Sequence, residues 1–170
     1  MRLTARIALI GCLLLAVHVV PAAAYLAPGE PAPDVALTDL TGKRMRLSSF
    51  RGRNLVLVFG ATWCPACKAQ VDDLLQTQSL LKKKQITVLT IFLDDKPRHI
   101  KKYVAGKRFP VPFHAFPDNG QAQKAYRIFV VPRVIIIDPD FKVVYDGMQL
   151  SSKDLNEKFA VLPEKAKGIE

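Results

Sequence analysis

Residues 55–67, LVLVFGATWCPAC, join an apolar run to two cysteines that are separated by two residues. Residues 55–59 carry no polar side chain, which is typical of a strand that is covered on both faces of a sheet. Pro65 suits the first turn of a helix, because that position has no hydrogen bond for proline to lose. The stretch therefore predicts a buried strand that runs directly into a helix, with Cys64 at the junction.

Patterns on both sides of this stretch extend the prediction to one α/β domain with a mixed sheet. We expect a second buried strand at residues 86–93, parallel to the first because a helix connects the two. Helices are predicted at residues 65–82 and 97–105, and Asp94 or Asp95 is expected to cap the second one. A short helix is predicted up to Tyr126, and a last helix ends before Pro163. Short hairpins are predicted from residues 35–37 with 45–47 and 134–137 with 142–145, and residues 109–113 are predicted as a surface connection.

The first 24 residues have the three parts of a secretory signal peptide. Arg2 and Arg6 precede an apolar run over residues 7–20, and Ala22-Ala23-Ala24 follows it. We expect cleavage after Ala24, and retention of residues 7–24 as a membrane tether is the alternative. The predicted organisation is a signal peptide at 1–24, an extended leader at 25–33, a domain at 34–162 and a polar tail at 163–170.

Composition limits the possible functions further. The chain has 170 residues, a formal net charge of +10 and 24% charged residues, which fits one globular domain and an anionic partner or surface without naming either. Nucleic acid is not expected as a partner, because an exported chain without a binding motif gives no support for it. Cys12 leaves with the signal peptide, so that Cys64 and Cys67 remain in an oxidising compartment.

The spacing of Cys64 and Cys67 predicts redox chemistry. At a helix N-terminus, free N–H groups and the helix dipole favour a thiolate, which lowers the pKa of a thiol and makes Cys64 the nucleophile. Cys67 lies about 5–6 Å away on the same helical face and can attack a mixed disulfide on Cys64. A zinc site lacks further ligands, since His99 and His114 have no ligand-like spacing, and a structural disulfide over so short a loop adds little stability.

Four segments resemble the TlpA/ResA-like thioredoxins, which are secreted or membrane-tethered relatives of thioredoxin and include the thiol reductases of cytochrome c maturation. The segments, within a similarity that covers residues 32–162, are Ala32-Pro33-Asp34, Leu40-Thr41-Gly42-Lys43, residues 47–53 (LSSFRGR) and residues 60–67 (GATWCPAC). The resemblance implies a thioredoxin-like fold, with a central mixed sheet flanked by helices and an added N-terminal hairpin. It also implies no cofactor beyond the cysteine pair, and the spacing of the cysteines and histidines predicts no metal site.

The same resemblance implies that Val131-Pro132 is a cis-proline loop facing the cysteines. The backbone of Val131 would pair with an incoming substrate strand, and Pro132 would keep other ligands off the thiols. We assign catalysis to Cys64 and Cys67, and substrate binding to Trp63, Pro65, Val131 and Pro132. The chain departs from the family pattern at Val58, where thioredoxins carry a buried Asp, at Gly60, where Trp is common, and at residues 127–133 (RIFVVPR), which lack the usual Gly and Thr.

The expected function is a periplasmic or extracytoplasmic thiol–disulfide oxidoreductase, with reduction of protein disulfides as the favoured direction. Its partners would be protein thiol or disulfide clients and a membrane thiol electron donor. An oxidase or isomerase would use the same residues, because the relative stability of thiolate and disulfide sets the direction. A thiol peroxidase is a further alternative, although Ala61 stands where peroxiredoxins have Thr, and a copper- or haem-delivery module is the non-enzymatic one.

Overall fold

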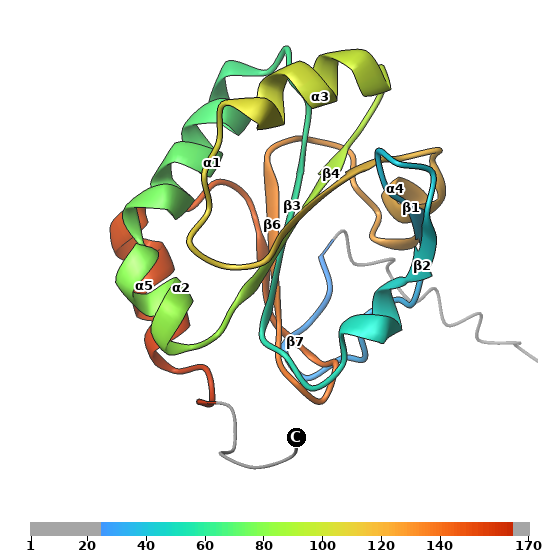
Figure 1. The fold of residues 1–170 in the computed structure, drawn as a ribbon. Helices are drawn as coiled ribbons and strands as arrows, with labels where there is room; N and C mark the ends of the chain where they lie inside the picture. The colour runs from blue at the N-terminus through green and yellow to red at the C-terminus, as the bar shows by residue number, and fades with distance from the viewer. Residues whose placement is uncertain (1–24, 165–170) are drawn as a thin grey trace, which may run out of the picture.

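The buried strand before the cysteine motif is the centre of a five-stranded sheet (Figure 1). The computed structural model describes residues 25–164. Its elements follow in the order β1 (Ala36–Thr38), β2 (Arg44–Arg46), the 3₁₀ turn η1 (Leu47–Phe50), β3 (Leu55–Gly60), α1 (Pro65–Gln76), α2 (Gln78–Lys83), β4 (Thr87–Phe92), α3 (Pro97–Ala105), β5 (Phe113–Pro117), α4 (Gln121–Ala125), β6 (Arg133–Ile137), β7 (Val143–Gly147) and α5 (Ser152–Ala160).

The sheet has the order β5-β4-β3-β6-β7 and is mixed, as the sequence predicts. β3 runs parallel to β4, with Gly60 opposite Phe92, which confirms the predicted parallel pair. β3 also runs antiparallel to β6, with Phe59 opposite Arg133. Consequently one end of the sheet carries the end of β3, the end of β4 and the start of β6.

The strand residues alternate between two apolar cores, one on each face of the sheet. In β3, Leu55, Leu57 and Phe59 face the core beneath the N-terminal hairpin and α4, whereas Val56 and Val58 face the core beneath α1, α2 and α5. Figure 1 shows these two layers on opposite sides of the sheet. The helices found within residues 25–164 are too short or too polar to cross a membrane.

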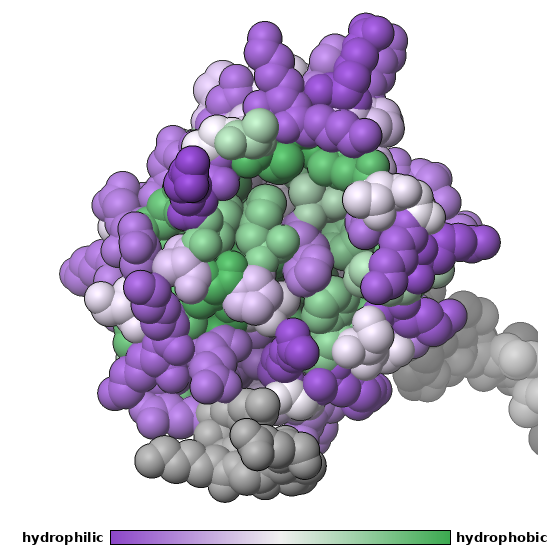
Figure 2. Space-filling model, in the orientation of Figure 1, coloured by the Kyte–Doolittle hydropathy of each residue, from purple (hydrophilic) through white to green (hydrophobic). Residues whose placement is uncertain are grey.

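One face of the molecule carries a central apolar area that is ringed by polar side chains (Figure 2). It lies over β4 and the segment that joins α3 to β5. Phe109 and Val111 of this segment are partly buried against the core, and the Phe109 ring stacks at 4.4 Å on that of Phe113, the first residue of β5. This area is a continuation of the core to the surface.

The helix after the cysteine motif is interrupted, so the prediction of one helix over residues 65–82 is wrong. Thr77 separates α1 from α2, with φ −94° and ψ 23°. Its N–H and its Oγ1 both donate to the carbonyl oxygen of Leu74, at 3.0 and 2.8 Å. In a continuous helix this oxygen would accept from Gln78, so the threonine side chain replaces the helical bond and ends α1.

Two further expectations need correction. Helix α3 begins at Pro97 as predicted, but its N-cap residue is Lys96, which makes no side-chain cap, so neither Asp94 nor Asp95 caps it. Residues 113–117 form β5, a parallel edge strand that the sequence did not predict. The prolines on both sides of its short pattern hide the strand, and the parallel pairing with β4 stabilises it.

The N-terminal hairpin is present, and the leader before it packs on the rest of the chain. β1 and β2 pair antiparallel, with Leu37 opposite Met45, as predicted. In the leader, Gly29 donates to the carbonyl oxygen of Val143, and Tyr126 donates from its hydroxyl to the carbonyl oxygen of Pro33 at 2.8 Å. Burial raises the pKa of Tyr126. The predicted signal peptide, together with residues 165–170 of the tail, lies outside the described residues.

A buried ion pair joins the start of β6 to β7. Arg133 and Asp146 form two hydrogen bonds, the Nη2–Oδ2 bond being 3.0 Å long, and their side chains are 4% and 0% exposed. The leader closes over this pair, because Leu26 donates its N–H to Asp146 Oδ2 at 2.7 Å and the Tyr25 ring lies 3.6 Å from the Arg133 guanidinium. A charged residue is thus fixed directly after Pro132.

We predict that Asp146→Ala lowers the free energy of unfolding by about 3–5 kcal/mol, because it leaves the Arg133 charge buried without its carboxylate. Urea unfolding of the disulfide-bonded protein measures the change. Asp140→Ala is the control, since Asp140 is exposed, and it should stay within about 0.5 kcal/mol of the parent. Equal unfolding midpoints for the two variants would show that the pair does not stabilise the fold.

Candidate functional site

The two cysteines lie where β3 ends and α1 begins. Cys64 is the N-cap residue of α1, and Cys67 lies in the first turn of this helix. They form a disulfide bond, with 5.3 Å between their Cα atoms. The Cys64 sulfur also accepts a hydrogen bond from the Cys67 N–H at 3.1 Å. The structure therefore brings the predicted pair together at the positive end of a helix.

Trp63 and Pro65 flank Cys64 and both face solvent. The Trp63 side chain is 66% exposed, which is unusual for so large an apolar residue. Pro65 is exposed at the first position of α1, as its missing N–H allows. Cys64 itself is only 7% exposed, so that a reacting group has to approach between these neighbours.

Val131 and Pro132 lie against the cysteines from the other side. The peptide bond between them is cis. Val131 is partly buried on the cluster formed by Ala61, Cys64 and Cys67, and Pro132 is buried. The two residues immediately before this loop are exposed and apolar, Phe129 at 81% and Val130 at 56%. All of the predicted site residues therefore lie at the end of the sheet where β3 ends.

The departures at positions 58 and 60 have local explanations. Val58 is fully buried and packs in the apolar core beneath α1, so an apolar side chain suits this position. At position 60, an added Cβ would lie 3.1 Å from the Cβ of Cys67 and 3.3 Å from its sulfur. A larger residue at position 60 would therefore crowd the second cysteine, which would have to shift by a few tenths of an ångström.

Asp95 and Thr62 belong to this site, and the sequence reasoning missed them. Thr62 donates from its backbone N–H to Asp95 Oδ2 at 2.5 Å and from its hydroxyl to Asp95 Oδ1 at 3.0 Å. The Asp95 side chain is 1% exposed, and Nδ1 of His99 lies 3.7 Å from its Oδ1. The signal for Asp95 was its place just after a buried parallel strand, where functional side chains of α/β sheets gather.

The other histidine lies away from this group. His114 is on β5, where its ring meets that of Phe50 edge to face at 5.2 Å, and burial lowers its pKa. Within residues 25–164, no three His, Cys, Asp or Glu side chains are grouped as metal ligands would be.

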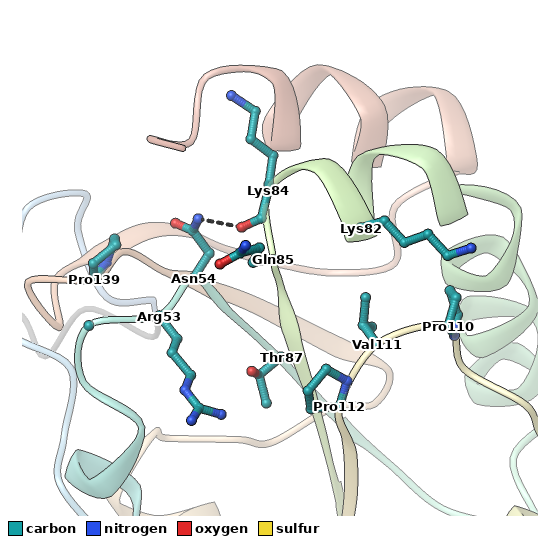
Figure 3. A pocket seen from close by; sticks show the side chains of 11 residues that line it. Arg53, Asn54, Lys82, Lys84, Gln85, Thr87, Pro110, Val111, Pro112 and Pro139 are labelled. Carbon is teal, nitrogen blue, oxygen red and sulfur yellow. Dashed lines mark hydrogen bonds between the residues drawn. The ribbon is translucent and has the colours of Figure 1, made fainter. Parts of the chain in front are cut away.

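A cavity of about 350 Å³ lies at the opposite end of the sheet (Figure 3). Thr87 at the start of β4 lines it, together with Arg53, Gln85, Val111 and Pro112, among other residues. In Figure 3 the Arg53 side chain extends beside Thr87 and Pro112, whereas Lys84 points away. Residues 110–112 line this cavity, which lies far from Cys64 because Thr87 pairs with Leu55 at the beginning of β3.

Comparison with known proteins identifies the family. A profile of the AhpC/TSA family matches residues 28–146, which include the cysteine motif and the cis-proline loop. The chain belongs to the AhpC/TSA family. One relative is thiol-disulfide oxidoreductase ResA of Geobacillus kaustophilus, 30% identical over 119 residues that cover 69% of this chain and 67% of the relative. ResA of Bacillus thuringiensis subsp. konkukian is 28% identical over 133 residues, which cover 77% and 75%.

Solved structures agree with this assignment. A thiol:disulfide interchange protein of the DsbE type from Chlorobium tepidum superposes with a TM-score of 0.68 and 29% identity, over 79% of this chain and 96% of that one. A thioredoxin family protein from Chlorobium tepidum TLS superposes with a TM-score of 0.65 at 22% identity, over 79% and 97%, and supports the fold alone. The resemblance to TlpA/ResA-like thioredoxins and the thioredoxin-like fold are confirmed, and the chain is a thiol–disulfide oxidoreductase.

Proposed function

We propose that the chain is an extracytoplasmic reductase of protein disulfides in which Cys64 attacks and Cys67 resolves. The position of Cys64 as the N-cap of α1 is the observation that carries the assignment of the attacking cysteine, and the similarity to ResA supports reduction as the direction. The Cys67 N–H that donates to the Cys64 sulfur in the disulfide is available to a Cys64 thiolate in the reduced form. Together with the helix dipole, this hydrogen bond favours a negative charge on Cys64 over one on Cys67.

The reaction consists of two thiol–disulfide exchanges. In the first, the Cys64 thiolate forms a bond to one sulfur of the substrate disulfide, whose S–S bond breaks and releases the other sulfur as a thiolate. In the second, the Cys67 thiolate attacks the Cys64 sulfur, and the remaining substrate sulfur leaves as a thiolate. Two electrons pass from the cysteine pair to the substrate, and Cys64 and Cys67 end as the disulfide present in the structure.

Substrate binding is assigned to the exposed residues around the sulfur pair. An extended substrate segment would pair with the backbone of Val131, and the buried Pro132 would hold this loop in place beside Cys64. Trp63, Phe129 and Val130 offer apolar surface on the two chain segments that flank the cysteines. Pro65 borders the same approach to Cys64. This arrangement favours polypeptide substrates with apolar side chains near the reacting cysteine, because apolar contact area stabilises their binding.

The cycle requires an external dithiol that returns the cysteine pair to the reduced form. We assign this role to a membrane thiol carrier, in line with the export pattern of residues 1–24. The exchange itself needs no cofactor and no metal, because the two cysteine sulfurs supply both electrons. An oxidase or an isomerase would use the same residues, and the reduction potential decides between the directions.

We predict a reduction potential near or below about −250 mV for the Cys64–Cys67 couple, in the range of thioredoxin-like reductants. Equilibration of the protein from residue 25 to residue 170 with thiol buffers, followed by alkylation, measures it. A potential above about −150 mV would make the protein an oxidant and overturn the proposed direction.

We predict that Cys64→Ser lowers the rate of disulfide reduction at least about 100-fold, since it removes the nucleophile. Cys67→Ser should instead accumulate a mixed disulfide between Cys64 and the substrate, which mass spectrometry under non-reducing conditions detects. Ala69→Ser is the matched control, because it places a serine at an exposed position of α1 outside the cysteine motif and should react at the parent rate. Full activity in Cys64→Ser would refute the assignment of the two cysteines.

We predict that Phe129→Ser raises KM for an apolar peptide disulfide about fivefold, with little change in kcat. The expected loss of about 1 kcal/mol corresponds to partial burial of one aromatic side chain by the substrate. Steady-state kinetics with the peptide and with a small hydrophilic disulfide measure the effect, which should be absent for the small one. Val161→Ser is the control, since Val161 is 74% exposed but follows α5; an equal effect there would exclude a docking role for Phe129.

A further inference from the structure

The turn that carries Cys64 is held by a side chain from the neighbouring strand connection. The N–H of Cys64 donates to the carbonyl oxygen of Ala61 at 3.2 Å, which closes a four-residue turn over Ala61–Cys64. Thr62 is the second residue of this turn. Both of its hydrogen-bond donors, the backbone N–H and the hydroxyl, are bound to the Asp95 carboxylate.

Asp95 reaches this turn because of the sheet register. β4 is parallel to β3 and their last residues are paired, so the connections after the two strands leave the sheet side by side. The Asp95 side chain lies between these connections with 1% of its surface exposed. Its carboxylate therefore lies in a largely desolvated place, where a charge acts more strongly on its neighbours than it would in water.

Because Asp95 binds Thr62, two residues before Cys64 in the same turn, its negative charge opposes a thiolate on Cys64. The disulfide is neutral and the reduced form gains a thiolate, so a neighbouring carboxylate destabilises the reduced form relative to the disulfide. The two donors of Thr62 offset part of this charge. Asp95 and Thr62 thus have opposite effects on the equilibrium between dithiol and disulfide, while both hold the turn that presents Trp63 and Cys64.

We propose that Asp95 is a positioning residue that fixes the turn Ala61–Cys64. Its negative charge makes the cysteine pair more reducing, and the hydrogen bonds from Thr62 weaken this effect. The inference rests on the proposed thiol–disulfide exchange at Cys64 and adds a determinant of its direction. It also gives a function to a carboxylate that would otherwise be taken for a helix cap, since the N-cap residue of α3 is Lys96.

The test compares Asp95→Asn, Asp94→Asn and Thr62→Val in the full chain, with the parent as reference. Asp95→Asn keeps the size of the side chain and an acceptor for the Thr62 N–H but removes the charge. It should raise the equilibrium constant for reduction by glutathione about three- to tenfold, a tenfold change being about 30 mV, and should increase the alkylation rate of reduced Cys64. Asp94→Asn removes the adjacent, exposed carboxylate and should leave both quantities at the parent values.

Thr62→Val separates an electrostatic effect from a loosened turn. It removes the hydroxyl donor and leaves the Asp95 charge less compensated, so it should lower the equilibrium constant about twofold and slow alkylation. Shifts of opposite sign in Asp95→Asn and Thr62→Val support the inference, and shifts of the same sign overturn it. Equal values for Asp95→Asn and Asp94→Asn also overturn it.

The outcomes remain distinct from a failure of the proposed function. If the parent protein shows a reversible two-electron couple but Asp95→Asn does not shift it, only the role of Asp95 fails. If the parent protein shows no reversible couple, the proposed function and the role of Asp95 fail together. Should Asp95→Asn be too unstable to measure, Thr62→Val decides alone, and a shift of its couple toward the dithiol would contradict the role of Asp95.

Discussion

The pairing of β3 with both β4 and β6 is the constraint on which the site depends. β6 lies antiparallel to β3 with Phe59 opposite Arg133, so the loop that ends in Pro132 returns to the end of β3 where Cys64 lies. β4 lies parallel to β3, so the connection after β4 begins at the same end of the sheet. Three chain segments that are distant in sequence thus meet at one end of the sheet. A change in the register of β3 with β4 or of β3 with β6 would separate them.

The charged side chains at this end of the sheet have different roles. Arg133 and Asp146 neutralise each other beneath the leader, where both side chains are almost fully buried, and they fix the start of β6. Among residues 25–164, the cation-forming group found within 4 Å of the Asp95 carboxylate is the exposed His99, at 3.7 Å. The first pair therefore acts on the position of the cis-proline loop, whereas the charge of Asp95 acts on the sulfur chemistry.

Much of this arrangement follows from the sequence, because its strongest signals are local. The apolar run of β3, the proline at the start of α1 and the CxxC spacing predict the strand, the helix and the disulfide pair without tertiary information. β5 and Asp95 were missed for a common reason, since each depends on the parallel pairing with β4 and leaves no periodic pattern of its own. The break at Thr77 depends on a single hydroxyl group that replaces a helical hydrogen bond. Helix propensity does not predict this replacement.

The fold depends on its apolar cores more than on the disulfide for its stability. A bond between residues three positions apart closes so small a loop that it hardly restricts the unfolded chain. The fold rests instead on two apolar cores, whose strand residues are almost completely buried on both faces of the sheet. Reduction of Cys64 and Cys67 therefore affects one turn and the first residues of α1, where hydrogen bonds to Asp95 and to the Cys64 sulfur hold the backbone. Most of the stability thus resides in the two cores, whereas the charge of Asp95 shifts the equilibrium between dithiol and disulfide at the turn that carries Cys64.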